Sequence, residues 1–174
     1  NNNKPLIIDP LVYSTFLGGS YHDYGRCIAV DANGCAYVTG YTTSSNYPTK
    51  TGAYDDSYNG SYDIFITKLS ADGTSLQYST FIGGSYRDVG YGIEVDENGC
   101  AYITGYTQST NYPTTSGTFD GSHNGNEDSY VTKLSSDGTV LVYSTFLGGG
   151  SKDVGLGITV NENGYAFVTG YTAS

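Results

Sequence analysis

The heptapeptide Tyr13-Ser14-Thr15-Phe16-Leu17-Gly18-Gly19 decides how the chain is organised, because nearly identical copies begin at Tyr78 and Tyr143. The three starting points are 65 residues apart, and no insertion disturbs that spacing. A repeat of fixed period indicates a fold built from stacked copies of one small unit. The same offset relates many other positions: Asp23, Asp88 and Asp153; Gly25, Gly90 and Gly155; Asn33-Gly34, Asn98-Gly99 and Asn163-Gly164.

Each full repeat contains four short segments with the composition of β-strands. In the middle of the chain they cover 64–69, 76–82, 93–95 and 101–104, and turn residues separate them. The stretch 106–127 is polar and aperiodic, which predicts a long surface loop. No segment has the apolar periodicity of a helix. The sequence therefore predicts an all-β fold of four-stranded antiparallel blades.

Two of the strands are apolar on both faces, as Ile64-Phe65-Ile66 and Leu141-Val142-Tyr143 show. A sheet with one wet face would alternate apolar and polar residues. Sheets covered on both faces at a fixed period favour a propeller-type array. A β-solenoid is disfavoured because the hairpin turns require antiparallel pairing.

One set of residues is predicted to shape turns. Asn-Gly and Asp-Gly pairs favour tight hairpins, and the aspartate after each Gly-Gly break can accept backbone N–H bonds. Catalysis by these aspartates is not indicated, because a repeat is expected to give each copy the same surroundings. The set comprises Asp23, Asn33, Gly34, Asp72, Gly73, Asp88, Asn98, Gly99, Asp137, Gly138, Asp153, Asn163 and Gly164.

Together, the runs 9–19, 23–40, 46–49 and 63–69 resemble the beta-propeller repeat family called SBBP. The resemblance covers nearly the whole chain. It implies a secreted or cell-surface prokaryotic protein whose repeats serve as an extracellular scaffold, with no enzymatic activity. The sequence differs from the family pattern in carrying cysteines where small polar residues are usual, and in having few repeats.

The repeat phase divides the chain into units 1–44, 45–109 and 110–174. The first unit is short, and Leu6-Ile7-Ile8 is a candidate replacement for its first strand. Three four-stranded sheets are expected, each joining the last two strands of one unit to the first two of the next. Three blades rarely close into a ring, so we expect an array that is incomplete as a single chain. Either the chain is a fragment of a longer propeller, or copies of it associate into a ring or filament.

Charge excludes two classes of partner. The 174 residues include 17 acidic and 7 basic side chains, a net charge of −10. Nucleic acid and anionic lipid both select Lys- and Arg-rich surfaces. Membrane insertion is not expected, because no apolar run approaches the roughly 18 residues of a span. The three cysteines are expected to be small buried thiols, with a Cys35–Cys100 bond between neighbouring units as the alternative.

Self-association as a non-catalytic extracellular structural protein is the predicted function, and a lectin-like module is the alternative. Aromatic rings beside carboxylates and amides suit sugars. Calcium in the oxygen-rich loops is a weaker possibility than ordinary turn chemistry, so no cofactor is predicted. Asn59-Gly60-Ser61 is also a glycosylation sequon. The candidate sugar-binding residues are Tyr47, Tyr54, Asp55, Asp56, Tyr58, Asn59, Tyr112, Phe119, Asp120 and Asn124.

Overall fold

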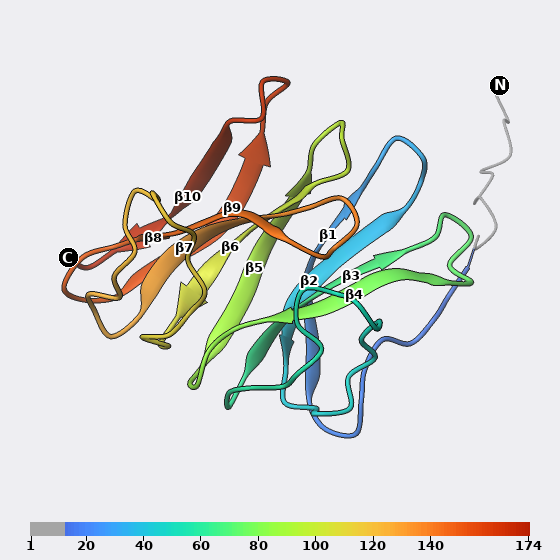
Figure 1. Cartoon of the computed structure of the whole chain (residues 1–174), viewed down its shortest axis with the longest axis horizontal. Coiled ribbons are helices and arrows are strands. Elements are labelled where there is room, and N and C mark those ends of the chain that lie inside the picture. The colour runs from blue at the N-terminus through green and yellow to red at the C-terminus, as the bar shows by residue number, and fades with distance from the viewer. Residues whose placement is uncertain (1–12) are drawn as a thin grey trace, which may run out of the picture.

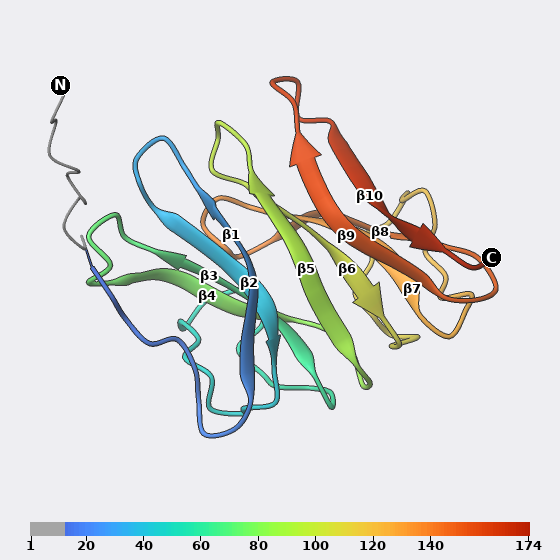
Figure 2. The ribbon, with the colours of Figure 1, turned by 180° about the vertical axis from the view of Figure 1, so that it is seen from behind.

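Figure 1 shows a computed structural model of the chain, in which residues 13–174 are described. Three antiparallel sheets stand side by side in an open row, with the N-terminal sheet at one end and the C-terminal sheet at the other (Figures 1 and 2). The prediction of an all-β, propeller-type array is confirmed. Within the described part of the chain, no helix has the length and apolar character of a membrane span.

Strand order in every sheet follows the chain. The first sheet contains β1 (Asp23–Val30), β2 (Ala36–Thr42), β3 (Asp63–Leu69) and β4 (Leu76–Ile82). The second contains β5 (Asp88–Val95), β6 (Ala101–Thr107), β7 (Asp128–Leu134) and β8 (Leu141–Leu147). The third contains β9 (Asp153–Val160) and β10 (Ala166–Thr172).

The expectation of three four-stranded sheets is wrong for the third sheet, which has two strands. Each complete sheet joins the last two strands of one repeat to the first two of the next. No described strand takes the two positions beyond β10 that β3 and β4 occupy in the first sheet. The candidate replacement strand at 6–8 lies outside the described residues.

The hairpin turns have the same geometry in successive repeats. The Oδ1 atom of Asp31 accepts the N–H groups of Asn33 and Cys35, both at 2.9 Å. This bonding holds Gly34 at a φ of 81°, a left-handed conformation that glycine adopts without steric cost. The equivalent glycines, Gly99 and Gly164, have φ values of 80° and 76°. Local side-chain bonding therefore determines where β1 ends and β2 begins. The same turn geometry recurs in the following repeats.

Neighbouring sheets pack face to face. β5 lies across β1, β2 and β3, and β9 lies in the same way across β5, β6 and β7. The main core runs through the first contact, where Ile64 and Ile66 of β3 cluster with Ile93 of β5 and Ile103 of β6. Apolar residues on both faces of the strands are thus explained by a neighbour on either side.

The closest approach between sheets occurs at a glycine. A Cβ atom on Gly90 of β5 would lie 2.6 Å from the Oγ1 atom of Thr39 and 3.2 Å from the carbonyl oxygen of Gly40, both in β2. The Thr39 hydroxyl is held in place because it donates to the carbonyl of Phe65, at 2.9 Å. In the next pair of sheets, the Thr104 hydroxyl takes up the Cβ space of Gly155. The spacing of the sheets therefore requires glycine at these two positions.

Gly90→Ala is expected to lower the free energy of unfolding by about 1–3 kcal/mol, because the added methyl group overpacks the contact with Thr39. Gly121→Ala is the control, since a Cβ there would meet nothing closer than Thr118 Cγ2, at 3.7 Å. Urea denaturation of both variants measures the difference. An equal loss of stability in the two would contradict the role given to the Gly90–Thr39 contact.

Candidate functional site

The long loops that connect β2 to β3 and β6 to β7 fold down onto their own sheets. Tyr47 is 3% exposed and stacks on Phe65, with ring centroids 4.5 Å apart. Its hydroxyl lies 3.1 Å from the Thr67 hydroxyl. Tyr112 is buried in the same way against Tyr130. The rings of Tyr47 and Tyr112 therefore offer no free face to a sugar.

The other candidate sugar-binding residues of the first loop mostly bond within it. The two carboxylate oxygens of Asp55 accept the Ser57 N–H and the Asn59 side-chain amide, each at 2.8 Å. The Tyr58 hydroxyl donates to the Ser61 carbonyl at 2.6 Å. Asp120 and Asn124 repeat the Asp55–Asn59 bonding in the second loop.

Three candidates remain outside this bonding. Tyr54 is half-buried, and burial raises the pKa of its phenol. Asp56 is exposed, and Phe119 is 87% exposed. The structure does not gather the ten residues into one accessible site, and carbohydrate binding stays a prediction.

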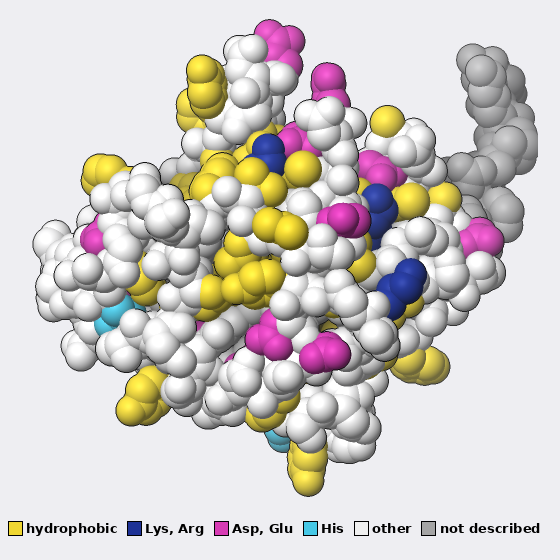
Figure 3. Space-filling model, viewed as in Figure 1, with side chains coloured by type: hydrophobic (Ala, Val, Ile, Leu, Met, Phe, Trp, Pro, Cys, Tyr) yellow, Lys and Arg dark blue, Asp and Glu magenta, His cyan; other side chains and the backbone are white. Residues whose placement is uncertain are grey.

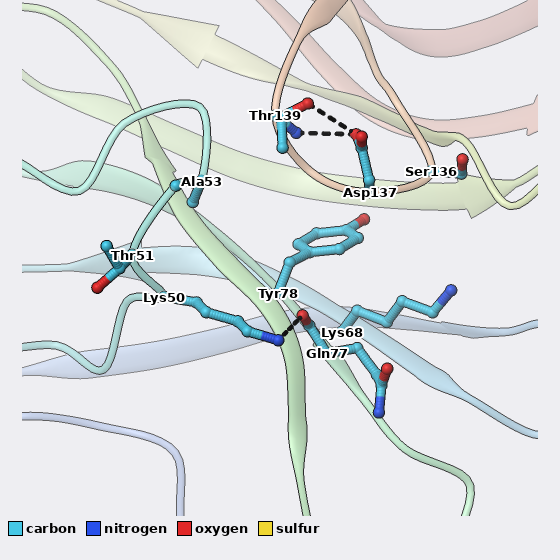
Figure 4. Close-up of a pocket in the computed structure, with 10 residues that line it drawn as sticks. Lys50, Thr51, Ala53, Lys68, Gln77, Tyr78, Ser136, Asp137 and Thr139 are labelled. Carbon is cyan, nitrogen blue, oxygen red and sulfur yellow. Dashed lines mark hydrogen bonds between the residues drawn. The ribbon is translucent and has the colours of Figure 1, made fainter.

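A crevice of about 370 Å³ lies between the first two sheets, where the 50–53 loop faces the β7–β8 turn (Figure 4). The charged groups around it already have protein partners. Lys50 donates from Nζ to the Gln77 carbonyl at 2.8 Å, and Asp137 accepts the Thr139 hydroxyl at 2.9 Å. Lys68 lies 3.6 Å from Asp31. The crevice thus presents few groups that need a ligand.

A buried pair of carboxyl groups lies beside the Gly83-Gly84 break. Asp63 is buried, and its Oδ2 accepts the Asn59 N–H at 2.6 Å, while the backbone N–H of Gly60 also favours the charged carboxylate. Burial raises the pKa of Asp63 to about 6, and the nearby charge of Asp88 acts in the same direction. Burial likewise raises the pKa of Asp88. We therefore expect the stability of this sheet junction to depend on pH.

The repeat equivalents of this pair have different surroundings. Both oxygens of Asp128 are bonded, since Asn124 donates at 2.6 Å and Gly125 at 2.9 Å. Burial acts to raise the pKa of Asp153, but hydrogen bonds from its neighbours, Gly149 and Ser174 among them, outweigh it and leave the pKa lowered. The three aspartates that follow the Gly-Gly breaks nevertheless share the bonding expected of them, because Asp23, Asp88 and Asp153 each accept the N–H of the second glycine of the break at 2.7 Å. Among residues 13–174, no group of three or more Asp, Glu, His or Cys side chains is arranged to hold a metal ion.

Wild-type stability is expected to fall as the pH rises from about 4 to above 6. The folded state raises the Asp63 pKa from 3.8 to about 6, so its proton stabilises the fold below this range and is lost through it. Asp63→Asn should flatten this part of the profile, whereas Asp128→Asn should leave it. Unfolding midpoints measured between pH 4 and 7 decide the matter, and an unchanged slope in Asp63→Asn would contradict the assignment.

The outer face of β10 exposes side chains that are buried in the inner sheets. We call it the tail face and define it by Tyr165, Phe167, Thr169 and Tyr171. Phe167 is 56% exposed, while its equivalents Tyr37 and Tyr102 are fully buried. Tyr37 and Tyr102 point toward the following sheet, because each hydroxyl donates to a turn carbonyl there, Gly99 or Gly164, at 3.3 Å. The tail face is thus the surface on which a following sheet would pack.

The outer face of β1 is exposed at the opposite end of the row. We call it the head face and define it by Gly25, Ile28 and Val30. Ile28 is 61% exposed, whereas its equivalent Ile93 in β5 is 4% exposed. The next equivalent, Ile158, points back to the preceding sheet, since its Cγ2 lies 3.3 Å from the Cβ position of Gly92. The head face is therefore the surface that packs on a preceding sheet.

The other surfaces of the molecule are mainly polar. On the side shown in Figure 3, hydrophobic side chains reach the surface in separate patches, with acidic side chains spread between them. Basic side chains contact aromatic rings along the sheet junctions. Arg87 lies 4.5 Å from the ring centroid of Tyr62, and Lys152 lies 6.0 Å from that of Tyr171. Arg87 thus bridges two sheets, whereas Lys68 and Lys133 pair with Asp31 and Asp96 of their own sheets.

Comparison with known families agrees with this architecture. The family model described as SBBP, beta-propeller repeat, matches residues 12–48 and 77–113. These two stretches of the chain match SBBP beta-propeller repeats. The second match runs from β4 through β5 and β6 into the following loop, so an SBBP repeat spans a junction between sheets. Repeats of the SBBP family are generally non-catalytic. A search of curated proteins gave no match.

The cysteines are free thiols, as expected, but Cys27, Cys35 and Cys100 are half-buried and not fully buried, and the alternative of a Cys35–Cys100 bond is wrong. The repeats in the sequence do not by themselves show which residues form the head and tail faces. The signal for them was present in the glycines at 25, 90 and 155 and the threonines at 39, 104 and 169.

Proposed function

We propose that the protein is a non-catalytic structural component of the cell exterior that self-associates through its head and tail faces. One observation carries the proposal. Residues that are buried wherever two sheets meet inside the chain are exposed at the ends, as Ile28 and Phe167 are. Exposed apolar clusters of this kind mark interaction sites.

The chemistry of the faces supports association. Covering a large apolar side chain contributes about 1.5–3 kcal/mol. The two faces together offer five such side chains. The free energy gained by covering them is comparable with the entropic cost of association, roughly 4–15 kcal/mol. The five side chains are Ile28 and Val30 on the head face and Tyr165, Phe167 and Tyr171 on the tail face.

The surrounding charge supports solubility. A net charge of −10 keeps the remaining surface hydrated and opposes unspecific aggregation. It leaves the apolar faces as the preferred contact. An exterior scaffold is also what the resemblance to the SBBP family implies.

The pure chain is expected to form species heavier than 18.5 kDa as its concentration rises. Ile28→Asp and Phe167→Asp should each shift the distribution toward the monomer, because a charge is then placed on an apolar face. Sedimentation velocity over a hundredfold concentration range measures both effects.

Val140→Asp is the matched control, because Val140 is exposed in the β7–β8 turn, where its repeat equivalent Ser75 is also exposed, and the change should leave association unaltered. A wild-type chain that remains an 18.5 kDa monomer at the highest concentration would contradict the proposed function.

A further inference from the structure

We infer that the association is directional: the tail face of one copy binds the head face of the next. This inference rests on the proposed self-association and specifies the partner surface. The head and tail faces correspond to the two unlike sides of an interface that the chain already makes twice, between β1–β3 and β5 and between β5–β7 and β9; the tail face supplies the part that belongs to the two strands β9 and β10. A second copy of the chain is therefore the occupant that fits each face.

The glycine at position 25 is the first argument for this register. Its equivalents Gly90 and Gly155 each receive a threonine hydroxyl from the preceding sheet in their Cβ space. At Gly25 the space is open, and the nearest side-chain atom of the described chain is 3.8 Å from the Cβ position. Its φ is not in the left-handed region, so the backbone of Gly25 does not require glycine. A preceding sheet accounts for the missing side chain.

The threonine that would occupy this space is present on the tail face. Thr169 is the repeat equivalent of Thr39 and Thr104, and it is exposed on β10. Gly170 follows it, as Gly40 follows Thr39, and supplies the equivalent backbone carbonyl. Docking Thr169 and Gly170 of one copy over Gly25 of the next reproduces the inner contact with the same residue types.

The apolar residues match in the same register. In the inner junction, Tyr37 of β2 and Ile93 of β5 belong to one buried cluster. Their counterparts are Phe167 on the tail face and Ile28 on the head face, both more than half exposed. The head face carries small and aliphatic residues, and the tail face carries three aromatic rings. Two head faces together would provide neither the rings nor the threonine.

Continuity of the aromatic contacts supports the same arrangement. Tyr41 of β2 clusters with Val89 of β5 across the inner junction. Tyr171 and Tyr24 are the corresponding residues of the tail and head ends, and both are about half exposed. In a head-to-tail junction, Tyr171 would lie beside Tyr24 of the next copy. Tyr24 already stacks on Tyr41, with centroids 4.8 Å apart, so the aromatic row would continue from copy to copy.

A head-to-tail contact has a structural consequence that a symmetric contact lacks. Every added copy leaves one head face and one tail face unused, so growth continues as an open filament or stops when a ring closes. A symmetric contact between two head faces or two tail faces ends at a dimer. The number and identity of the copies in each complex therefore distinguish the two arrangements.

Mixing two variants tests the direction. Ile28→Asp blocks the head face and Phe167→Asp blocks the tail face, and both side chains are exposed, so each variant should fold. Each variant alone should remain a monomer. Mixed in equal amounts, they should form a one-to-one dimer of twice the monomer mass and nothing larger. The intact tail face of Ile28→Asp can bind the intact head face of Phe167→Asp, and no other intact face remains.

The outcomes separate this inference from the proposed function. A wild-type chain that never associates contradicts both. Association of the wild type combined with a dimer of either variant alone, or with no dimer in the mixture, contradicts the direction and leaves self-association standing. Sedimentation velocity or native mass spectrometry distinguishes these cases, and circular dichroism confirms that each variant is folded.

Gly25→Ala tests the register with a smaller change. Its Cβ should meet Thr169 and the Gly170 carbonyl of the preceding copy, which should weaken association about tenfold. Gly121→Ala is the control, because a Cβ there meets nothing closer than 3.7 Å and the residue lies in the β6–β7 loop. Equal association of Gly25→Ala and wild type would overturn the register.

Discussion

Successive sheets approach so closely that a threonine hydroxyl of one occupies the space in which the next would carry a Cβ atom. Gly90 against Thr39 and Gly155 against Thr104 set this distance. The rest of the packing depends on it. At that separation the rings of Tyr37 and Tyr102 reach the next turn, and the apolar residues on both strand faces are covered. An exposed strand face at either end is thus a junction surface without its neighbour.

The repeats are alike in sequence and in the bonding of their turn aspartates, since Asp23, Asp88 and Asp153 each accept a glycine N–H at 2.7 Å. Their pKa directions nevertheless differ. The pKa of Asp88 in the middle is raised and that of Asp153 near the end is lowered. A row of sheets therefore has local differences in pH response that equal spacing along the chain does not suggest.

Much of the fold could be predicted because periodicity and turn chemistry are local. The 65-residue spacing identifies equivalent residues, and Asp31 and Gly34 specify a hairpin on their own. What could not be predicted is which of several equivalent residues a neighbouring sheet covers. The sequence does not distinguish Tyr37, which is buried, from Phe167, which is exposed, since their neighbours along the chain are similar. The sequence also does not show that the loop rings of Tyr47 and Tyr112 pack on the sheet, which leaves them no free face for a sugar.

The central claim is that the head and tail faces are the two halves of one interface. Hydrogen–deuterium exchange of the wild-type chain at low and high concentration tests it most directly. The account predicts that amide protection rises with concentration in β1 and in β9–β10, while the inner strands β5 and β6 keep their exchange rates. Concentration-independent exchange in both end segments, or a rise confined to one of them, would contradict it.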